Sequence, residues 1–159
     1  MISVTSTVPV NPPGEEPHLT REDVWAGLLL KTEDALPFVP AMTRCEVLEH
    51  YDDGLLREVE FRGQTFRERI TLTPMDRVRF DRIPGSPVEG FILNEIEEDA
   101  NGELTLRFSF NLEIAGIEAG SEEEQAYERT MSGDYLKAVG ATLAAVRKMV
   151  AERHPALTR

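Results

Sequence analysis

The apolar residues of the chain change their spacing several times, and each spacing predicts an element. Near the N-terminus Ile2, Val4, Val8 and Val10 alternate with small polar residues, which is the two-residue period of a half-buried strand. The range 44–114 contains six further strand-like runs, separated by short turns rich in Gly, Pro, Asn and Asp. Such regular spacing is typical of consecutive antiparallel hairpins.

Two parts of the chain have helical spacing instead. Thr20 and Asp23 resemble a capping box, and they open a helix that is ended by the prolines of LPFVP (36–40), where we expect a second short helical turn. Its apolar face consists of Val24, Trp25, Leu28 and Leu29. A long helix is expected from Ser121, which can form a capping box with Glu124, to about Arg153, with Pro155 closing it.

This order of elements predicts the fold class. A strand, two short helices, six strands and a long helix indicate an α+β protein with a single domain over residues 1–159. A curved seven-stranded antiparallel sheet that grips the long C-terminal helix would bury every amphipathic face. The turn signals include Asn101-Gly102 and the segment Pro84-Gly85-Ser86-Pro87.

The run REVEFRGQTFRERITL (57–72) carries seven charges in two expected strands. Strand alternation places most of these charges on one face. A turn centred on Gly63 and Gln64 would pair Glu60 with Arg67, and Glu58 with Arg69, across that face. We therefore expect a solvated outer face held by cross-strand ion pairs.

Three charges fall on the opposite face. Arg57 and Glu68 alternate with apolar residues, on the side of the sheet that should meet the long helix. On the next strand Arg82 continues the side of Val78 and Phe80, and a turn over residues 74–76 would place Glu68 opposite Arg82. The pattern predicts an inward-facing Arg57–Glu68–Arg82 cluster. Such a cluster can be a structural ion pair or part of a binding site, and the sequence leaves both open.

A fourth inward polar residue depends on one turn. If Asn101 and Gly102 form a type I turn with a bulge, Asn94 faces inward between Ile92 and Ile96. A two-residue turn would bring Glu95 inward instead. We expect Asn94.

Composition excludes several classes of function. The net charge is −12, so nucleic acid is not an expected partner, and no apolar run is long enough to insert into a membrane. Cys45 is the single cysteine, and the N-terminus lacks the features of a secretory signal, so we expect a cytoplasmic protein. The acids of 95–103 have the pattern of a solvated hairpin, and His18, His50 and His154 are scattered. No metal site and no cofactor are expected.

Several longer segments resemble a known family. VWAGLLLKTEDALPFVP, LLREVEFRG, RERITL, RVRF and NEIEED occur in this order before the long capped helix. Together they resemble the AtaL-like family, a domain of unknown function in the START/SRPBCC superfamily. The resemblance implies a helix-grip fold, as in the birch-pollen allergen, with a deep hydrophobic cavity. Members of the superfamily bind lipids, sterols and polyketides, and some are aromatase/cyclases. It implies no catalytic residues.

The resemblance and the inward polar residues together predict a binding protein for a small hydrophobic metabolite, with the polar residues orienting the polar group of the ligand. The alternatives are a cyclase-, aromatase- or isomerase-type enzyme using Glu68 or Tyr127 to move a proton, and an interaction module with a collapsed cavity. The expected ligand-binding residues are Arg57, Glu68, Arg82, Asn94, Trp25, Phe38, Phe80, Phe108, Tyr127 and Met131. The sequence leaves open whether the protein is an enzyme and whether it forms a homodimer.

Overall fold

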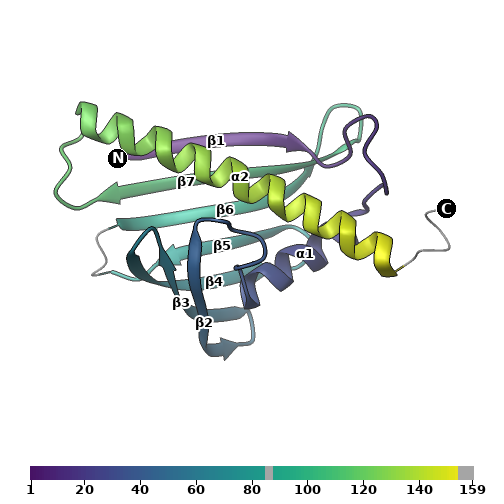
Figure 1. Ribbon diagram of the computed structural model, residues 1–159, viewed down its shortest axis with the longest axis horizontal. Helices are drawn as coiled ribbons and strands as arrows, with labels where there is room; N and C mark the ends of the chain where they lie inside the picture. Colours follow the sequence, from purple (N-terminus) through teal and green to yellow (C-terminus); the bar gives the residue numbers. More distant parts are fainter. Residues whose placement is uncertain (85–87, 154–159) are drawn as a thin grey trace.

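The computed structural model describes residues 1–84 and 88–153 (Figure 1). Its elements are β1 Ile2–Pro9, α1 Arg21–Glu33, β2 Met42–Tyr51, β3 Gly54–Phe61, β4 Gln64–Thr73, β5 Arg77–Arg82, β6 Val88–Glu98, β7 Leu104–Ile114 and α2 Glu122–Arg153. The predicted turn at 84–87 lies partly outside the described residues, and the surface position of His154 and the helix end at Pro155 lie wholly outside them.

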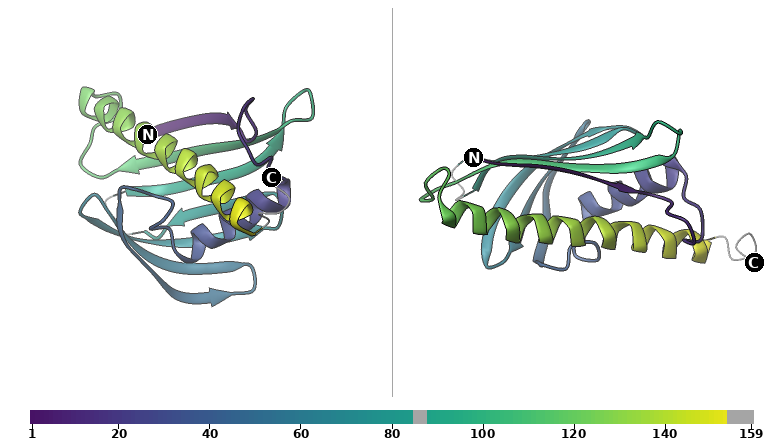
Figure 2. Two further views of the ribbon diagram at one scale, coloured as in Figure 1. Left: turned by 45° about the vertical axis from the view of Figure 1, so that its right-hand side comes forward. Right: turned by 90° about the horizontal axis from the view of Figure 1, so that it is seen from above.

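The strands form one antiparallel seven-stranded sheet in the order β1-β7-β6-β5-β4-β3-β2. Strands β2 to β7 follow one another by hairpins, and β1 adds to the free side of β7. The sheet curves, and α2 crosses its concave side while α1 covers one end of that side (Figures 1 and 2). The predicted α+β class, the seven strands and the long C-terminal helix are confirmed.

The segment between β1 and β2 differs from the prediction, because it contains one helix. The capping box of α1 is present, with the Asp23 amide donating to Thr20 Oγ1 and the Thr20 amide donating to the Asp23 carboxylate. Beyond α1, Phe38 and Val39 donate to the Ala35 carbonyl in an isolated turn. Pro37 within that turn and Pro40 directly after it remove amide donors and disfavour helical backbone before them, so no second helix forms.

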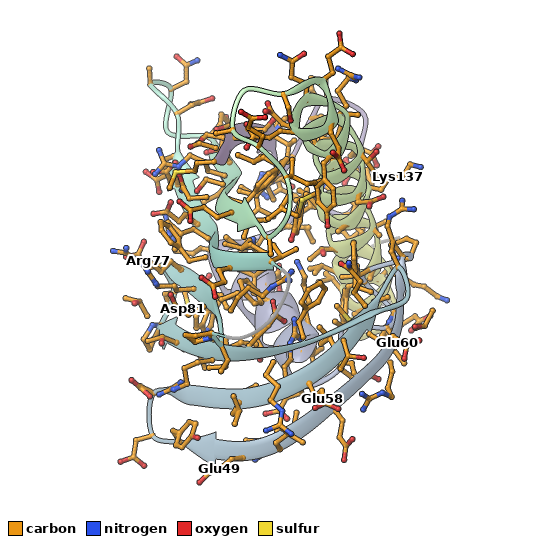
Figure 3. The ribbon with its side chains drawn as sticks, turned by 90° about the vertical axis from the view of Figure 1, so that its left-hand side faces the viewer. Glu49, Glu58, Glu60, Arg77, Asp81 and Lys137 are labelled. Atoms are coloured by element: carbon orange, nitrogen blue, oxygen red, sulfur yellow. The ribbon has the colours of Figure 1, made fainter. Side chains whose placement is uncertain are left out.

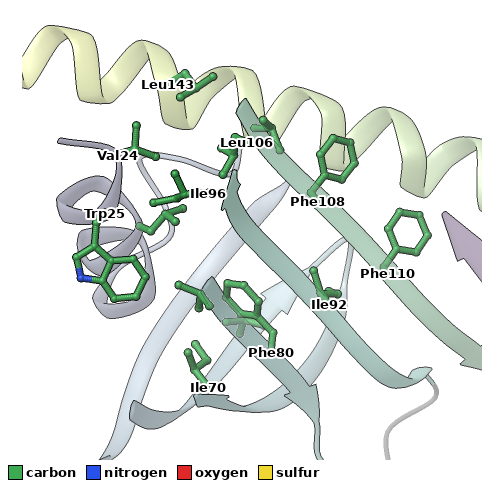
Figure 4. Close-up of a cluster of buried hydrophobic side chains, with 14 of the residues drawn as sticks. Val24, Trp25, Ile70, Phe80, Ile92, Ile96, Leu106, Phe108, Phe110 and Leu143 are labelled. Atoms are coloured by element: carbon green, nitrogen blue, oxygen red, sulfur yellow. The ribbon is translucent and has the colours of Figure 1, made fainter. Parts of the chain in front are cut away.

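The core lies between the sheet, α1 and α2 (Figure 4). Phe80, Ile92 and Phe108 are buried on the concave face, and Figure 4 shows Phe108 directly below α2. The two helices approach closely at Gly27, where an added Cβ would lie 2.2 Å from Val146 Cγ2. A residue without a side chain is therefore required at this helix crossing.

The predicted pairing of β3 with β4 is wrong by two residues. Glu58 lies opposite Arg67, and Arg57 lies directly opposite Glu68. The reason is a tight turn in which Arg62 and Gly63 both have positive φ, 50° and 76°, as a two-residue hairpin turn of this hand requires. The shift is even, so every side chain keeps the predicted face.

The remaining registers agree with the predictions. Glu68 lies opposite Arg82 on β5, and Asn94 is buried between Ile92 and Ile96 on β6. The outer face of the sheet is charged: Glu58 accepts from Arg44 and Arg67, and Figure 3 shows the labelled Glu58 and Asp81 on the outside of the curve. The concave face therefore holds the buried polar residues that matter for function.

Candidate ligand-binding site

Three charged side chains meet on the concave face of the sheet. Glu68 accepts a hydrogen bond of 3.0 Å from Arg57 Nε, and its other oxygen lies 3.4 Å from Arg82 Nε. The side chains are only 3%, 4% and 6% exposed for Arg57, Glu68 and Arg82. The cluster is therefore buried as well as paired, and one carboxylate lies between two guanidinium groups.

Arg57 has a structural role in this cluster. Its Nη1 donates to the carbonyl oxygens of Lys31 and Thr32, at 2.9 and 3.2 Å, and so satisfies the C-terminal end of α1. The guanidinium also lies over the Phe80 ring, 5.5 Å from its centroid. These contacts explain a buried arginine without any ligand.

Arg82 is different, because its partners do not use all of its donors. Its guanidinium stacks on the Phe66 ring at 4.0 Å and lies beside Glu68. Neither Nε nor Nη1 forms a hydrogen bond within the described part of the chain, although both atoms are buried. An unmade hydrogen bond at a buried charged donor costs on the order of 1–3 kcal/mol or more, so this group is suited to a ligand oxygen.

The cluster lines an inner cavity between the sheet and α2. Its volume is about 50 Å³, which holds a few water-sized groups. The lining residues are Lys31, Val39, Met42, Arg57, Val59, Phe61, Glu68, Phe80, Arg82, Ile92, Asn94, Phe108, Asp134, Tyr135, Ala138 and Val139. Apolar walls with a few converging polar groups are typical of a small-molecule site.

The electrostatics of the cavity favour negative charge. Burial alone would raise the pKa of Glu68, but Arg57, Arg82 and Lys31 outweigh it and hold this pKa below the ordinary value. Burial, assisted by Arg57 and opposed by Glu68, lowers the pKa of Lys31 to about 8. Burial raises the pKa of Tyr135 to about 12, although Arg82 acts in the opposite direction.

An outer cleft of about 470 Å³ adjoins the inner cavity, and Phe61, Arg82 and Asp134 line both. Tyr127 and Met131 of α2 also line this cleft. Asp134 belongs in addition to a third cleft, and Arg62 lines both this cleft and the outer one. A bidentate ion pair between Arg62 and Asp134 joins the β3–β4 turn to α2 here, so we call it the entrance ion pair.

The structure brings together most of the predicted site residues. Six of them line the inner cavity, namely Arg57, Glu68, Arg82, Asn94, Phe80 and Phe108. Trp25 and Phe38 are buried in packed clusters and are not among the residues that line the cavity or the clefts. Of the LPFVP segment, Val39 lines the inner cavity.

Lys31, Asp134 and Tyr135 also line the inner cavity, and they were not among the residues predicted from the sequence. Helical spacing could have found them, because Lys31 follows Val24 and Leu28 at seven and three residues, on the buried face of α1. Asp134 and Tyr135 likewise follow Met131 at three and four residues in α2. A polar residue at helical spacing on an otherwise apolar face is the signal that identifies such positions.

Comparison with known proteins decides the family. The model of the family described as acetylaranotin biosynthesis cluster protein L, AtaL, matches residues 4–153. The chain belongs to the AtaL family. No curated protein matches this AtaL-family chain in sequence.

Solved structures show the helix-grip fold of the START superfamily for this AtaL-family protein. A START superfamily protein from Mycobacterium smegmatis has a TM-score of 0.72 at 13% identity, over 94% of this chain and 99% of that one. The Zhui aromatase/cyclase from Streptomyces sp. R1128 has a TM-score of 0.60 at 21% identity, covering 96% and 94%. The di-domain ARO/CYC StfQ of the steffimycin biosynthetic pathway has a TM-score of 0.73 at 11% identity. This chain spans about half of StfQ, with 94% of the chain covering 52% of that protein.

No helix of residues 1–84 or 88–153 is long and apolar enough to cross a membrane. Within the same residues, His, Cys, Asp and Glu side chains form no group that could hold a metal ion.

Proposed function

We propose that this AtaL-family protein binds a small hydrophobic metabolite, polyketide-like, lipid-like or aromatic, that carries an anionic group. The apolar body of the ligand occupies the outer cleft, next to Tyr127 and Met131. The anionic group enters the inner cavity and accepts hydrogen bonds from Arg82. The observation that carries this proposal is the buried Arg82 guanidinium at the junction of the two spaces: within the described residues its Nη1 forms no hydrogen bond, and its Nε has only the Glu68 carboxylate, at 3.4 Å.

The balance of buried charge supports an anionic group. The cavity is lined by three cationic side chains, Lys31, Arg57 and Arg82, and by two carboxylates. One of these carboxylates, Asp134, is already paired with Arg62, so Glu68 alone faces the three cations. Buried charge without a counter-charge is costly, and a ligand anion would reduce that cost.

The relatives agree with this class of ligand. Both a START superfamily protein and aromatase/cyclases share the fold. The fold alone does not assign a ligand, and the proposed ligand class rests on the residues of the site.

The enzyme alternative needs a general base near neutral pH. Glu68 is a poor base, because its pKa is held below the ordinary value. Tyr135 keeps its proton, because burial raises its pKa to about 12. A binding role therefore accounts for these two residues better than proton transfer does.

Fluorescence titration with two hydrophobic probes tests the proposal. Anilinonaphthalene sulfonate is anionic, and phenylnaphthylamine is its neutral relative. Arg82→Met should weaken binding of the anionic probe about 10- to 150-fold, which corresponds to a charge-assisted hydrogen bond of roughly 1.5–3 kcal/mol. Binding of the neutral probe should change by less than about threefold, because the apolar cleft remains.

The matched control is Arg79→Met on the same strand. Arg79 is on the outer face, paired with Asp81 at 2.9 Å, and its side chain is 42% exposed. This variant should bind both probes like the wild type. Equal affinity of the wild type and Arg82→Met for the anionic probe would refute the proposal, as would a wild type that binds neither probe.

A further inference from the structure

Lys31 is a buried lysine whose amine faces the inner cavity. It lies in the last turn of α1 and is 7% exposed, although lysine is almost never buried without a paired charge. Its Nζ donates to Asn94 Oδ1 at 3.0 Å and lies 5.9 Å from the centroid of the Phe80 ring. Asn94 and Phe80 line the cavity, so they hold the amine at its wall.

A purely structural role explains this residue poorly. Lysine near a helix C-terminus interacts favourably with the helix dipole, but it normally does so from the solvent. Here the end of α1 is already satisfied by Arg57, which donates to the Lys31 and Thr32 carbonyls. An apolar side chain at position 31 would avoid burying a third cation beside Arg57 and Arg82.

The surroundings of the amine favour its uncharged form. The charged groups that share the cavity are Arg57 on β3, Glu68 on β4, Arg82 on β5 and Asp134 on α2. Burial and then Arg57 lower the pKa of Lys31, Glu68 raises it, and the result is about 8. Roughly one Lys31 in five is then neutral at about pH 7.4, against roughly one in a thousand for an exposed lysine.

We propose that Lys31 is a nucleophilic amine that forms an imine with an aldehyde or ketone group of a ligand in the inner cavity. A desolvated lysine beside another cation is a recognised way of activating an amine for this chemistry. The inference rests on the proposed function, because the amine is reached through the same cavity.

The reaction needs no further reagent. The lone pair of neutral Nζ forms a bond to the carbonyl carbon, and the C=O π electrons move to the oxygen. A proton passes from the nitrogen to that oxygen, which gives a carbinolamine. The C–O bond then breaks and the hydroxyl leaves with the second nitrogen proton as water, which leaves the neutral imine. The cationic neighbours Arg57 and Arg82 favour a neutral imine over its protonated form.

Imine formation would narrow the proposed ligand to a metabolite that carries an aldehyde or ketone group. The imine would hold a carbonyl-bearing metabolite in place, while Arg82 remains available for an acidic group of the same ligand. A hydrophobic oxo acid, with an aldehyde or ketone and a carboxylate, carries both of these groups.

Reductive trapping of the wild-type protein tests the inference. The chain has only three lysines, Lys31, Lys137 and Lys148. Both Lys137 and Lys148 are exposed, and Figure 3 shows Lys137 on α2. The folded protein is treated with propanal and cyanoborohydride at about pH 7.4, and peptide mass spectrometry measures propylation at each lysine.

Propylation of Lys31 should exceed that of Lys137 and Lys148 by about tenfold, since its larger neutral fraction outweighs the lower nucleophilicity of a less basic amine. In guanidinium chloride the three lysines should react alike. Propylation of Lys31 at or below the level of the exposed lysines in the folded protein would overturn the inference. If the anionic probe still binds in that case, only the imine formation at Lys31 is refuted. If the probe does not bind either, the proposed binding function is refuted as well.

Discussion

Raising the pH from 7 to 10 should stabilise the folded protein through one residue, Lys31. Its pKa is about 8 in the folded protein and 10.5 when it is exposed. Between these values the unfolded chain binds the proton and the folded protein does not, so the free energy of unfolding increases with pH. The contribution is fully present above about pH 10.5 and is lost as the pH falls through about 8.

The magnitude follows from the difference between the two pKa values. At 1.36 kcal/mol for each unit, the full effect is about 3 kcal/mol, of which about 2.5 kcal/mol should be gained by pH 10. Tyr135 acts in the opposite direction, because its pKa of about 12 exceeds that of an exposed tyrosine. Its effect becomes important only above about pH 10 and is common to the wild type and to variants at position 31.

The assay is urea unfolding at pH values from 7 to 10 for the wild type, Lys31→Met and Lys137→Met. The wild type and the exposed-lysine control should gain stability together, and Lys31→Met should fall behind them by about 2.5 kcal/mol over this range. Parallel curves for the wild type and Lys31→Met would refute the reasoning, because they would mean that Lys31 titrates like an exposed lysine.

Three further predictions concern the ion pairs and the packing of the helices. Glu68→Gln should reduce the free energy of urea unfolding by about 3–5 kcal/mol, because it leaves the buried arginines without a counter-charge. Its control, Glu58→Gln on the outer face, should reduce the free energy of unfolding by less than about 1 kcal/mol. Equal losses of stability in the two variants would show that burial does not decide the cost. Asp134→Asn should break the entrance ion pair and increase the association rate of anilinonaphthalene sulfonate in stopped-flow experiments, and an unchanged rate would show that this pair does not restrict entry. Gly27→Ala should destabilise the protein by roughly 1–3 kcal/mol in thermal unfolding, despite the higher helix propensity of alanine, because the new methyl group meets Val146. Adding Val146→Ala should recover part of that loss. If the two substitutions instead destabilise the protein additively, the side chains at these two positions do not clash.

The sequence was sufficient for the topology because the strand signals are local. Two-residue alternation assigned the faces of β3, β4 and β5, and this placed Arg57, Glu68 and Arg82 on one side. A two-residue shift in strand pairing leaves each side chain on the same face of the sheet. The error in the predicted turn at Gly63 therefore did not change which residues form the cluster.

The different roles of the two arginines could not be predicted from the pattern. Both have the same parity and the same partner, Glu68. They differ because the end of α1 lies against Arg57 and supplies two carbonyl acceptors, whereas Arg82 lies near the Tyr135 side chain and its Nη1 forms no hydrogen bond with the described residues. Contacts between a helix and a sheet depend on tertiary packing, which the spacing of residues does not encode.

The position of Trp25 shows the same limit. Its helical face was read correctly, and it is buried. Its expected place beside the cavity came from the family resemblance, but α1 presents Lys31 to the cavity and packs Trp25 into the main core (Figure 4). Six residues, fewer than two turns of helix, separate these two environments.

A crystal structure of the protein with bound anilinonaphthalene sulfonate would show directly whether Arg82 binds the anionic group. We expect the aromatic rings in the outer cleft against Tyr127 and Met131, and a sulfonate oxygen about 2.7–2.9 Å from Arg82 Nη1. A probe bound elsewhere on the surface, or one whose sulfonate points to solvent and leaves Arg82 Nη1 without a hydrogen bond, would refute the proposed binding mode.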